Sequence, residues 1–258
     1  MHLKHRESQI PSAEMIELSK VSKSYGERKA VSDLSLTVPP GSIFAFLGMN
    51  GAGKTTTIKM MTGILSPSSG SISIGGYDLK TDPIRAKQLV GYVPDRPHLY
   101  PKLTGREFLQ FMCDLYRVPQ ETTQERIDKV LDEYSLTPWQ DSLIESYSHG
   151  MRQRIALCGA LVHTPQILIV DEPMVGLDPH GARDLKRAFT RYARSGMTVF
   201  LSTHSLDVAE ELADSLAIIH KGKIIVSGSL EQIRDSAGSH ADGLEDIFLQ
   251  LTSAQLEH

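Results

Sequence analysis

The chain has 258 residues, of which 40% are hydrophobic and 22% charged, enough to bury a sizeable core as one large or two small domains. Its formal net charge of −4 argues against binding nucleic acid through a global basic field. No apolar run approaches the roughly 20 residues that span a bilayer, and the N-terminus lacks the apolar core of a signal peptide, so any membrane contact is expected to come through partners.

Short strands and turns are expected to make up the N-terminal part. We predict a flexible segment over residues 1–14, followed by strands at residues 15–18, 34–38, 43–47, 71–74 and 91–95. The first two should pair antiparallel around a turn at residues 25–28.

Residues 48–55 read G-M-N-G-A-G-K-T and match the phosphate-binding pattern G-x-x-x-x-G-K-[ST] at every specified position. A predicted strand precedes this loop and a helix follows it, which makes a chance glycine-rich turn a poor alternative. Glycines let backbone N–H groups curl around a phosphate, and the helix N-terminus adds positive potential. Lys54 should reach the β- and γ-phosphates. The predicted phosphate-binding residues are Gly48, Met49, Asn50, Gly51, Ala52, Gly53, Lys54, Thr55 and Thr56.

The pattern changes to helical over roughly residues 96–150, which we interpret as an insertion into an α/β core. A capping box at Thr104 and Glu107 precedes apolar residues at helical spacing. These are Phe108, Phe111, Met112 and Leu115. A stripe of this kind is more often core than binding surface. A second capping box is expected at Thr122 and Glu125. Cys113 and Cys158 have no metal-ligand spacing and should be small buried thiols.

Strands alternating with helices resume after the insertion and predict a largely parallel sheet. Strands are expected at residues 167–171, 197–201, 216–219 and 223–226, with helices at residues 181–194 and 207–212. The last two strands should form a hairpin. A closing helix over residues 244–252 should dock on the core through Ile247, Phe248 and Leu251.

Two of these elements carry residues suited to phosphoryl transfer, which needs a placed Mg²⁺ and an oriented nucleophile. Asp171 ends an apolar strand, where it suits a metal site. Glu172 should point the other way on an extended chain, and we interpret it as the general base. The alternative is an acidic strand end without a role. Ser148 and Gly150 open a helix whose N-terminus is a second anion site.

The order of these motifs resembles the ATP-binding cassette (ABC) transporter ATPases over about residues 15–228. The glycine loop resembles Walker A, residues 167–172 Walker B, residues 147–151 the L-S-G-G-Q signature, residues 176–178 the D-loop, and residues 202–204 the switch-histidine motif. The resemblance implies that Tyr25 stacks on adenine and that His204 bonds the γ-phosphate and helps hold the attacking water. Taken alone, Tyr25 would more often be an ordinary turn residue, and His204 after its strand would be similarly uninformative.

The resemblance also implies a fold, cofactors and partners. The expected fold is a P-loop NTPase core with a mostly parallel sheet, an N-terminal antiparallel β subdomain and the inserted helical subdomain, followed by a short tail over residues 229–258. ATP and Mg²⁺ are the implied cofactors, with Thr55, Asp95 and Asp171 around the metal. Two subunits, identical or related, should dimerise head to tail, so that Ser148, Gly150 and Asp178 complete the ATP site of the other subunit.

Separately encoded transmembrane permease subunits are the implied membrane partners, with this chain peripheral on the cytoplasmic face. Three residues depart from the family pattern: Asp95 replaces a glutamine, His149 a glycine and Met151 a glutamine. They leave open a catalytically weak regulatory subunit beside an active ATPase. A soluble ABC ATPase is a further alternative, although coiled-coil insertions and tandem cassettes are missing. The short tail resembles that of ABC-2-type exporters, which favours export over import.

Overall fold

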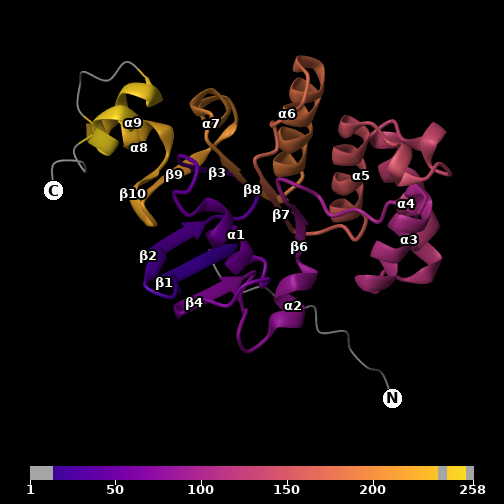
Figure 1. The fold of residues 1–258 in the computed structure, drawn as a ribbon, viewed down its shortest axis with the longest axis horizontal. Helices are drawn as coiled ribbons and strands as arrows, with labels where there is room; N and C mark the ends of the chain where they lie inside the picture. The colour runs from indigo at the N-terminus through magenta and orange to yellow at the C-terminus, as the bar shows by residue number, and fades with distance from the viewer. Residues whose placement is uncertain (1–13, 238–242, 254–258) are drawn as a thin grey trace.

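The computed structural model describes residues 14–237 and 243–253, and the predicted flexible N-terminus therefore lies almost wholly outside the described residues. Two sheets organise the described part (Figure 1). The first has the order β2-β1-β4-β5, with β1 Ile16–Tyr25, β2 Arg28–Val38, β4 Ser69–Ile74 and β5 Tyr77–Asp78. Each neighbouring pair in it is antiparallel, which confirms the predicted N-terminal hairpin.

The second sheet has the order β10-β9-β3-β8-β7-β6. Its strands are β3 Ile43–Leu47, β6 Val90–Val93, β7 Ile167–Asp171, β8 Thr198–Thr203, β9 Ser215–His220 and β10 Lys223–Gly228. All its pairs are parallel except β9 with β10, which form the predicted hairpin. The fold is therefore the expected α/β core with a mostly parallel sheet.

Strand β3 shows why the central strands are continuously apolar. All five of its residues are buried, and alternate side chains enter different cores, as the two-residue period of a strand requires. Ile43, Ala45 and Leu47 pack in the core on the helical side. Phe44 and Phe46 pack in the core shared with the first sheet, where Phe44 stacks on Phe200 with ring centroids 5.5 Å apart.

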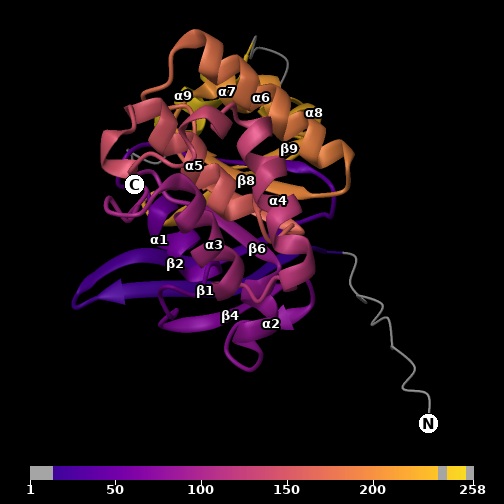
Figure 2. The same ribbon diagram turned by 90° about the vertical axis from the view of Figure 1, so that its right-hand side faces the viewer.

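Helices surround the second sheet and separate into groups. Their bounds are α1 Lys54–Met61, α2 Pro83–Gln88, α3 Gly105–Leu115, α4 Gln120–Glu133, α5 His149–Leu161, α6 Pro179–Arg194, α7 Leu206–Leu212, α8 Leu230–Ala237 and α9 Leu244–Ser253. Helices α3, α4 and α5 pack together on one side of the molecule, while α8 and α9 lie beside α7 (Figure 1). In the turned view, the first sheet and α6 to α9 occupy opposite ends (Figure 2). None of the described helices is long and apolar enough to cross a membrane.

Helix α3 has the predicted capping box, with Thr104 and Glu107 each accepting a hydrogen bond from the other's backbone N–H. The second predicted box is wrong, because α4 begins at Gln120 and Thr122 lies inside its first turn. Pro119, whose ring fixes φ near −56°, brings the chain directly into the helix. The Thr122 hydroxyl consequently donates to the Pro119 carbonyl, at 3.1 Å, and caps no free N–H.

The apolar stripe of α3 is only partly core. Phe108 is buried and Met112 packs against the core, but Phe111 and Leu115 are 41% and 62% exposed. Phe111 meets Tyr100 edge to face, with ring centroids 5.4 Å apart. The helix therefore presents an apolar strip to solvent, which the helical spacing alone could not distinguish from core.

Two further expectations concern buried groups. Cys113 and Cys158 are both buried and free, as predicted, and burial raises the pKa of the Cys113 thiol to about 11. In the closing helix, Ile247 is buried and Phe248 packs against the core. The side chain of Leu251 lies outside the described residues.

Candidate functional site

The glycine loop joins β3 to α1, and its shape depends on residues without a side chain. Gly51 has φ of +79° and Gly53 of +115°, in the left-handed region that favours glycine. Gly48 approaches β9 so closely that an added Cβ would lie 2.5 Å from the Ile219 carbonyl oxygen. The loop therefore lies tightly against the sheet, with the N-terminus of α1 opening into the space in front.

A pocket of about 650 Å³ lies in front of this loop, within the usual range for small-molecule sites. Its lining comprises Tyr25, Arg28, Lys29, Ala30, Met49, Asn50, Gly51, Gly53, Lys54, Thr55, Thr56, Asp95, Glu172 and Lys221. The structure thus brings most of the predicted loop residues together with Tyr25, Asp95 and Glu172. Gly48 and Ala52 lie behind the loop, where the Ala52 carbonyl accepts a hydrogen bond from Gly222 N–H.

Sequence reasoning missed the basic rim of this pocket, which consists of Arg28, Lys29 and Lys221. The bond between Gly222 and Ala52 explains how Lys221 arrives there, since it holds the β9–β10 turn against the loop. The signals in the sequence were the Lys-Gly turn of the predicted hairpin and two basic residues three and four positions after Tyr25. Neither signal places these residues at the pocket unless it is known which strands lie next to one another.

Lys54 is the centre of a charged cluster. Its ammonium lies 3.1 Å from Glu172 Oε1 and donates to the Gly48 carbonyl at 2.5 Å. The other carboxylate oxygen of Glu172 lies 2.9 Å from His204 Nδ1. The side chains of Lys54 and Glu172 are only 6% and 13% exposed, whereas His204 is half exposed. Glu172 therefore contacts both of the other residues predicted to be catalytic.

Glu172 does not continue the strand, contrary to the prediction of an extended chain. Its φ is +51°, a left-handed conformation that non-glycine residues seldom adopt. Pro173 follows it, and a proline ordinarily favours an extended conformation at the preceding residue. The chain bends at this point, and the bend turns the carboxylate towards Lys54 and His204. Strained backbone of this kind is concentrated at functional sites.

Asp171 is buried at the end of β7, with 2% of its surface exposed. Its Oδ2 accepts a hydrogen bond from the Thr55 hydroxyl at 2.9 Å, and its Oδ1 accepts one from the Ser202 hydroxyl. Tyr92 lies close by, and its pKa is raised to about 12 by burial, together with the charges of Asp171 and Asp95. Asp171 does not line the pocket itself, but its bond to Thr55 ties it to the pocket lining, to which Asp95 also belongs.

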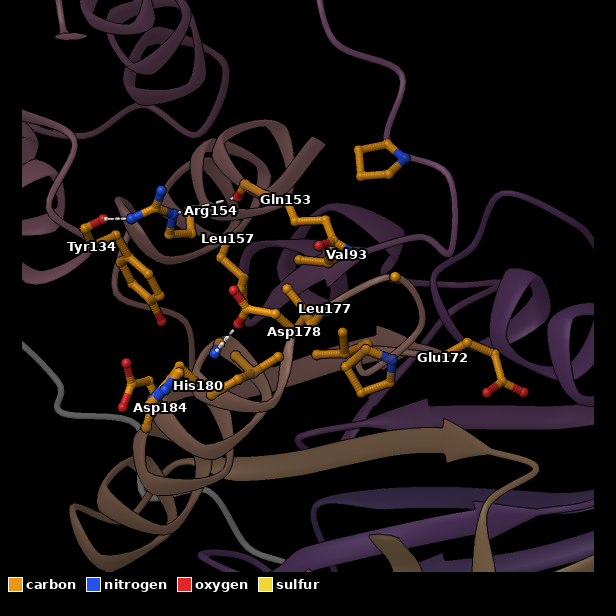
Figure 3. A pocket seen from close by; sticks show the side chains of 18 of the residues that line it. Val93, Tyr134, Gln153, Arg154, Leu157, Glu172, Leu177, Asp178, His180 and Asp184 are labelled. Atoms are coloured by element: carbon orange, nitrogen blue, oxygen red, sulfur yellow. Dashed lines mark hydrogen bonds between the residues drawn. The ribbon is translucent and has the colours of Figure 1, made fainter. Parts of the chain in front are cut away.

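Ser148, Gly150 and Asp178 line a different cavity, of about 710 Å³, between α4 and α5 on one side and β7 and α6 on the other (Figure 3). Ser148 caps α5 by accepting from Met151 N–H at 3.3 Å. Asp178 caps α6 by accepting from Gly181 N–H at 2.7 Å. Within one chain, these residues are thus separate from the glycine-loop pocket. Asp95 and Glu172 border both cavities.

Two contacts fix the start of α5 against the loop after β7. Gln153 Nε2 donates to the Val175 carbonyl at 2.9 Å. His149 covers Gly176, because a Cβ on that glycine would lie 2.7 Å from His149 Nε2. Gly176 also has φ of +78°, so His149 occupies space that only glycine leaves free. Sequence reasoning treated His149 as a departure and missed this contact.

Comparison with known proteins gives the family. The sequence matches the family described as ABC transporter over residues 31–175. The chain belongs to the ABC transporter family. It is 35% identical to the linearmycin resistance ATP-binding protein LnrL of Bacillus subtilis (strain 168), in an alignment covering 92% of this chain and 75% of that protein. It is 37% identical to the bacitracin transport ATP-binding protein BcrA of Bacillus licheniformis, covering 82% and 70%.

A solved structure described as the ATP binding subunit of an ABC transporter is also similar, with a TM-score of 0.87 and 33% identity over 92% of this chain and 99% of the other. The predicted family and fold are therefore confirmed. The chain binds and hydrolyses ATP as the ATPase subunit of an ABC transporter. As such a subunit, it works with transmembrane subunits.

Proposed function

We propose that this chain powers export, with ATP and Mg²⁺ bound at the glycine loop and Glu172 as the general base. The observation that carries the proposal is the contact of Glu172 with both Lys54 and His204 beside the buried Asp171. A base needs to lie within hydrogen-bond reach of the water that it activates. Glu172 and His204 would hold that water, and Lys54 would bind the β- and γ-phosphates.

The residues present fit the nucleotide. The loop glycines leave the phosphate side without side chains, and Lys54 can exchange the Gly48 carbonyl for a phosphate oxygen. Tyr25 is 52% exposed at the end of β1, with Lys23 5.6 Å from the ring centroid. A purine could stack on the free face of this ring. Lys54→Ala should accordingly weaken ATP binding, and unchanged affinity would contradict this phosphate site.

The residues also fit a hard divalent cation, which prefers oxygen ligands. Thr55 and Asp171 offer a hydroxyl and a carboxylate 2.9 Å apart, and Asp95 offers a second carboxylate at the pocket edge. The described residues contain no group of three or more His, Cys, Asp or Glu side chains that could hold a metal ion, so phosphate oxygens and water would complete the shell. Mg²⁺ supplies charge neutralisation at the transferred phosphate.

We propose further that two such subunits dimerise head to tail, with Ser148, Gly150 and Asp178 of one reaching the ATP of the other. Their place in a cavity other than the glycine-loop pocket of their own chain supports this arrangement. The N-terminus of α5 would then face the γ-phosphate, where its positive potential is favourable. Light scattering of Glu172→Gln with and without ATP tests it, and an ATP-saturated monomer would refute it for the homodimer.

The membrane partner is proposed to dock beside the loop that carries Asp95. The exposed strip of α3 and Tyr100 lies in the same part of the chain, and exposed apolar patches commonly mark interaction sites. The transmembrane subunits would be separately encoded, and this chain would lie on the cytoplasmic face. The names of the relatives, one for resistance and one for bacitracin transport, favour export. Transport measured in inside-out vesicles that contain both kinds of subunit tests the direction.

A second candidate is a catalytically weak regulatory subunit that pairs with an active ATPase. Asp95, His149 and Met151 favour it, because each replaces the residue that the family usually has. Phosphate release by the purified chain, alone and with its membrane partners, separates the two candidates. Turnover by the chain alone would refute the regulatory alternative, and absence of turnover in the assembled transporter would refute the active one.

A further inference from the structure

Ser202 connects the two acidic residues of the site. It lies on β8, fully buried, directly opposite Asp171 in the register of the parallel pair β7–β8. Its hydroxyl donates to Asp171 Oδ1 and accepts from the backbone N–H of Glu172 at 3.1 Å. The same N–H also lies 3.2 Å from the Ser202 carbonyl oxygen. One side chain thus holds the side chain of Asp171 and the backbone of Glu172.

This bridge holds two groups with unusual surroundings, the buried carboxylate of Asp171 and the left-handed backbone of Glu172. Asp171 is a buried carboxylate, and Thr55 and Ser202 each bind one of its oxygens, so loss of the Ser202 hydroxyl would leave Oδ1 without that donor. Hydrogen bonds to charged acceptors are stronger than neutral ones. Glu172 has the left-handed backbone described above. Its N–H is held by both the hydroxyl and the carbonyl oxygen of Ser202.

We infer that Ser202 is a positioning residue for ATP hydrolysis, which sets the orientation of the metal-binding carboxylate of Asp171 relative to the base Glu172. The inference rests on the roles proposed above for these two acids. Ser202 itself lies outside the lining of the nucleotide pocket, so it acts through them. Residues that orient metal ligands typically contribute 10- to 100-fold to metal affinity or activity.

The test compares Ser202→Ala with Ser202→Thr, which keeps the hydroxyl. Thr198→Val is the matched control, because Thr198 is also fully buried on β8 and its hydroxyl also binds backbone, accepting from Gly41 N–H at 2.9 Å, at the other end of the strand. Thermal denaturation shows whether the variants lose similar stability. Affinity for Mn²⁺ in the presence of a non-hydrolysable ATP analogue is measured by electron paramagnetic resonance, beside nucleotide affinity in EDTA and kcat.

Ser202→Ala should bind Mn²⁺ and hydrolyse ATP roughly 10- to 100-fold more weakly, with unchanged nucleotide affinity in EDTA. Ser202→Thr should restore most of both, and Thr198→Val should keep both. If Ser202→Ala matches Thr198→Val in Mn²⁺ affinity and kcat, Ser202 has a structural role alone. Asp171→Asn and Glu172→Gln separate this outcome from failure of the proposed site, since normal hydrolysis by either of them would refute the roles of the acids themselves.

Discussion

Replacing Glu172 by glutamine tests the charged cluster, because it removes one charge and keeps the shape. Glu172 Oε1 lies 3.1 Å from Lys54 Nζ, and both side chains are largely buried. The contact is an ion pair, and ATP competes with this carboxylate for the Lys54 ammonium. A charged contact of this kind contributes at most about 1.5–3 kcal/mol. The amide can still accept a bond from Lys54, so about half of that competition should disappear. Half of that energy is about 0.8–1.5 kcal/mol, so ATP should bind roughly 4- to 12-fold tighter.

Hydrolysis should change in the opposite direction. An amide cannot take a proton from water, so Glu172→Gln should lose about 10²–10⁴ of the hydrolysis rate. Equilibrium binding of ATP in EDTA and phosphate release with Mg²⁺ give the two values separately. Glu210→Gln is the control, since it makes the same change in an ion pair with Arg234 and lines neither cavity. Normal turnover by Glu172→Gln would exclude Glu172 as the base, and weaker ATP binding would contradict the competition for Lys54.

Three further variants test other parts of the fold. Gly48→Ala should push the loop away from β9, because its Cβ would lie 2.5 Å from the Ile219 carbonyl oxygen. ATP affinity should then fall tenfold or more, which is about the energy of one charged hydrogen bond. Gly243→Ala, with open space around it, is the control in the same binding assay. Thr104→Ala should lower the free energy of unfolding by about 1 kcal/mol in urea denaturation through loss of the α3 cap. Burial against Tyr116 lowers the pKa of His163 to about 4, so the unfolded chain takes up the proton first as the pH falls below about 6.5. Stability should therefore fall by about 2 kcal/mol between pH 7 and pH 5, and His163→Phe should remove that part of the pH dependence; an unchanged dependence would show that His163 is not its source.

Local sequence patterns predicted the elements that local chemistry determines. The glycine loop, the capping box of α3 and the buried strands each depend on residues within a few positions of one another. The bridge from Ser202 to Asp171 joins residues 31 positions apart, and it exists because β7 and β8 pair in one particular register. The same limit explains why Lys221 was missed at the pocket.

Two errors have a different origin, because in each of them another contact or residue overrode a sound local rule. An extended backbone at Glu172 was the ordinary expectation after a strand, and the following Pro173 favours it too. Its φ is nevertheless +51°, with its N–H bound to Ser202 and its carboxylate against Lys54 and His204. The second capping box was a reasonable pattern, but Pro119 starts the helix earlier. The exposed residues of α3 are a third error. The helical period shows which residues share one face of the helix, but it does not show whether another element covers that face.

The two cavities suggest how the membrane partner could influence hydrolysis. Asp95 and Glu172 are shared by both, so a shift of α4 and α5 relative to β7 changes the surroundings of both carboxylates at once. A polar bridge links the end of α4 to α6 across the second cavity, with the Tyr134 and Tyr192 hydroxyls 2.7 Å apart and Tyr192 bound to Glu133. Because Asp95 also lies in the loop where the permease is proposed to dock, replacing it by the family's usual glutamine should alter the stimulation of hydrolysis by the permease more than the basal rate.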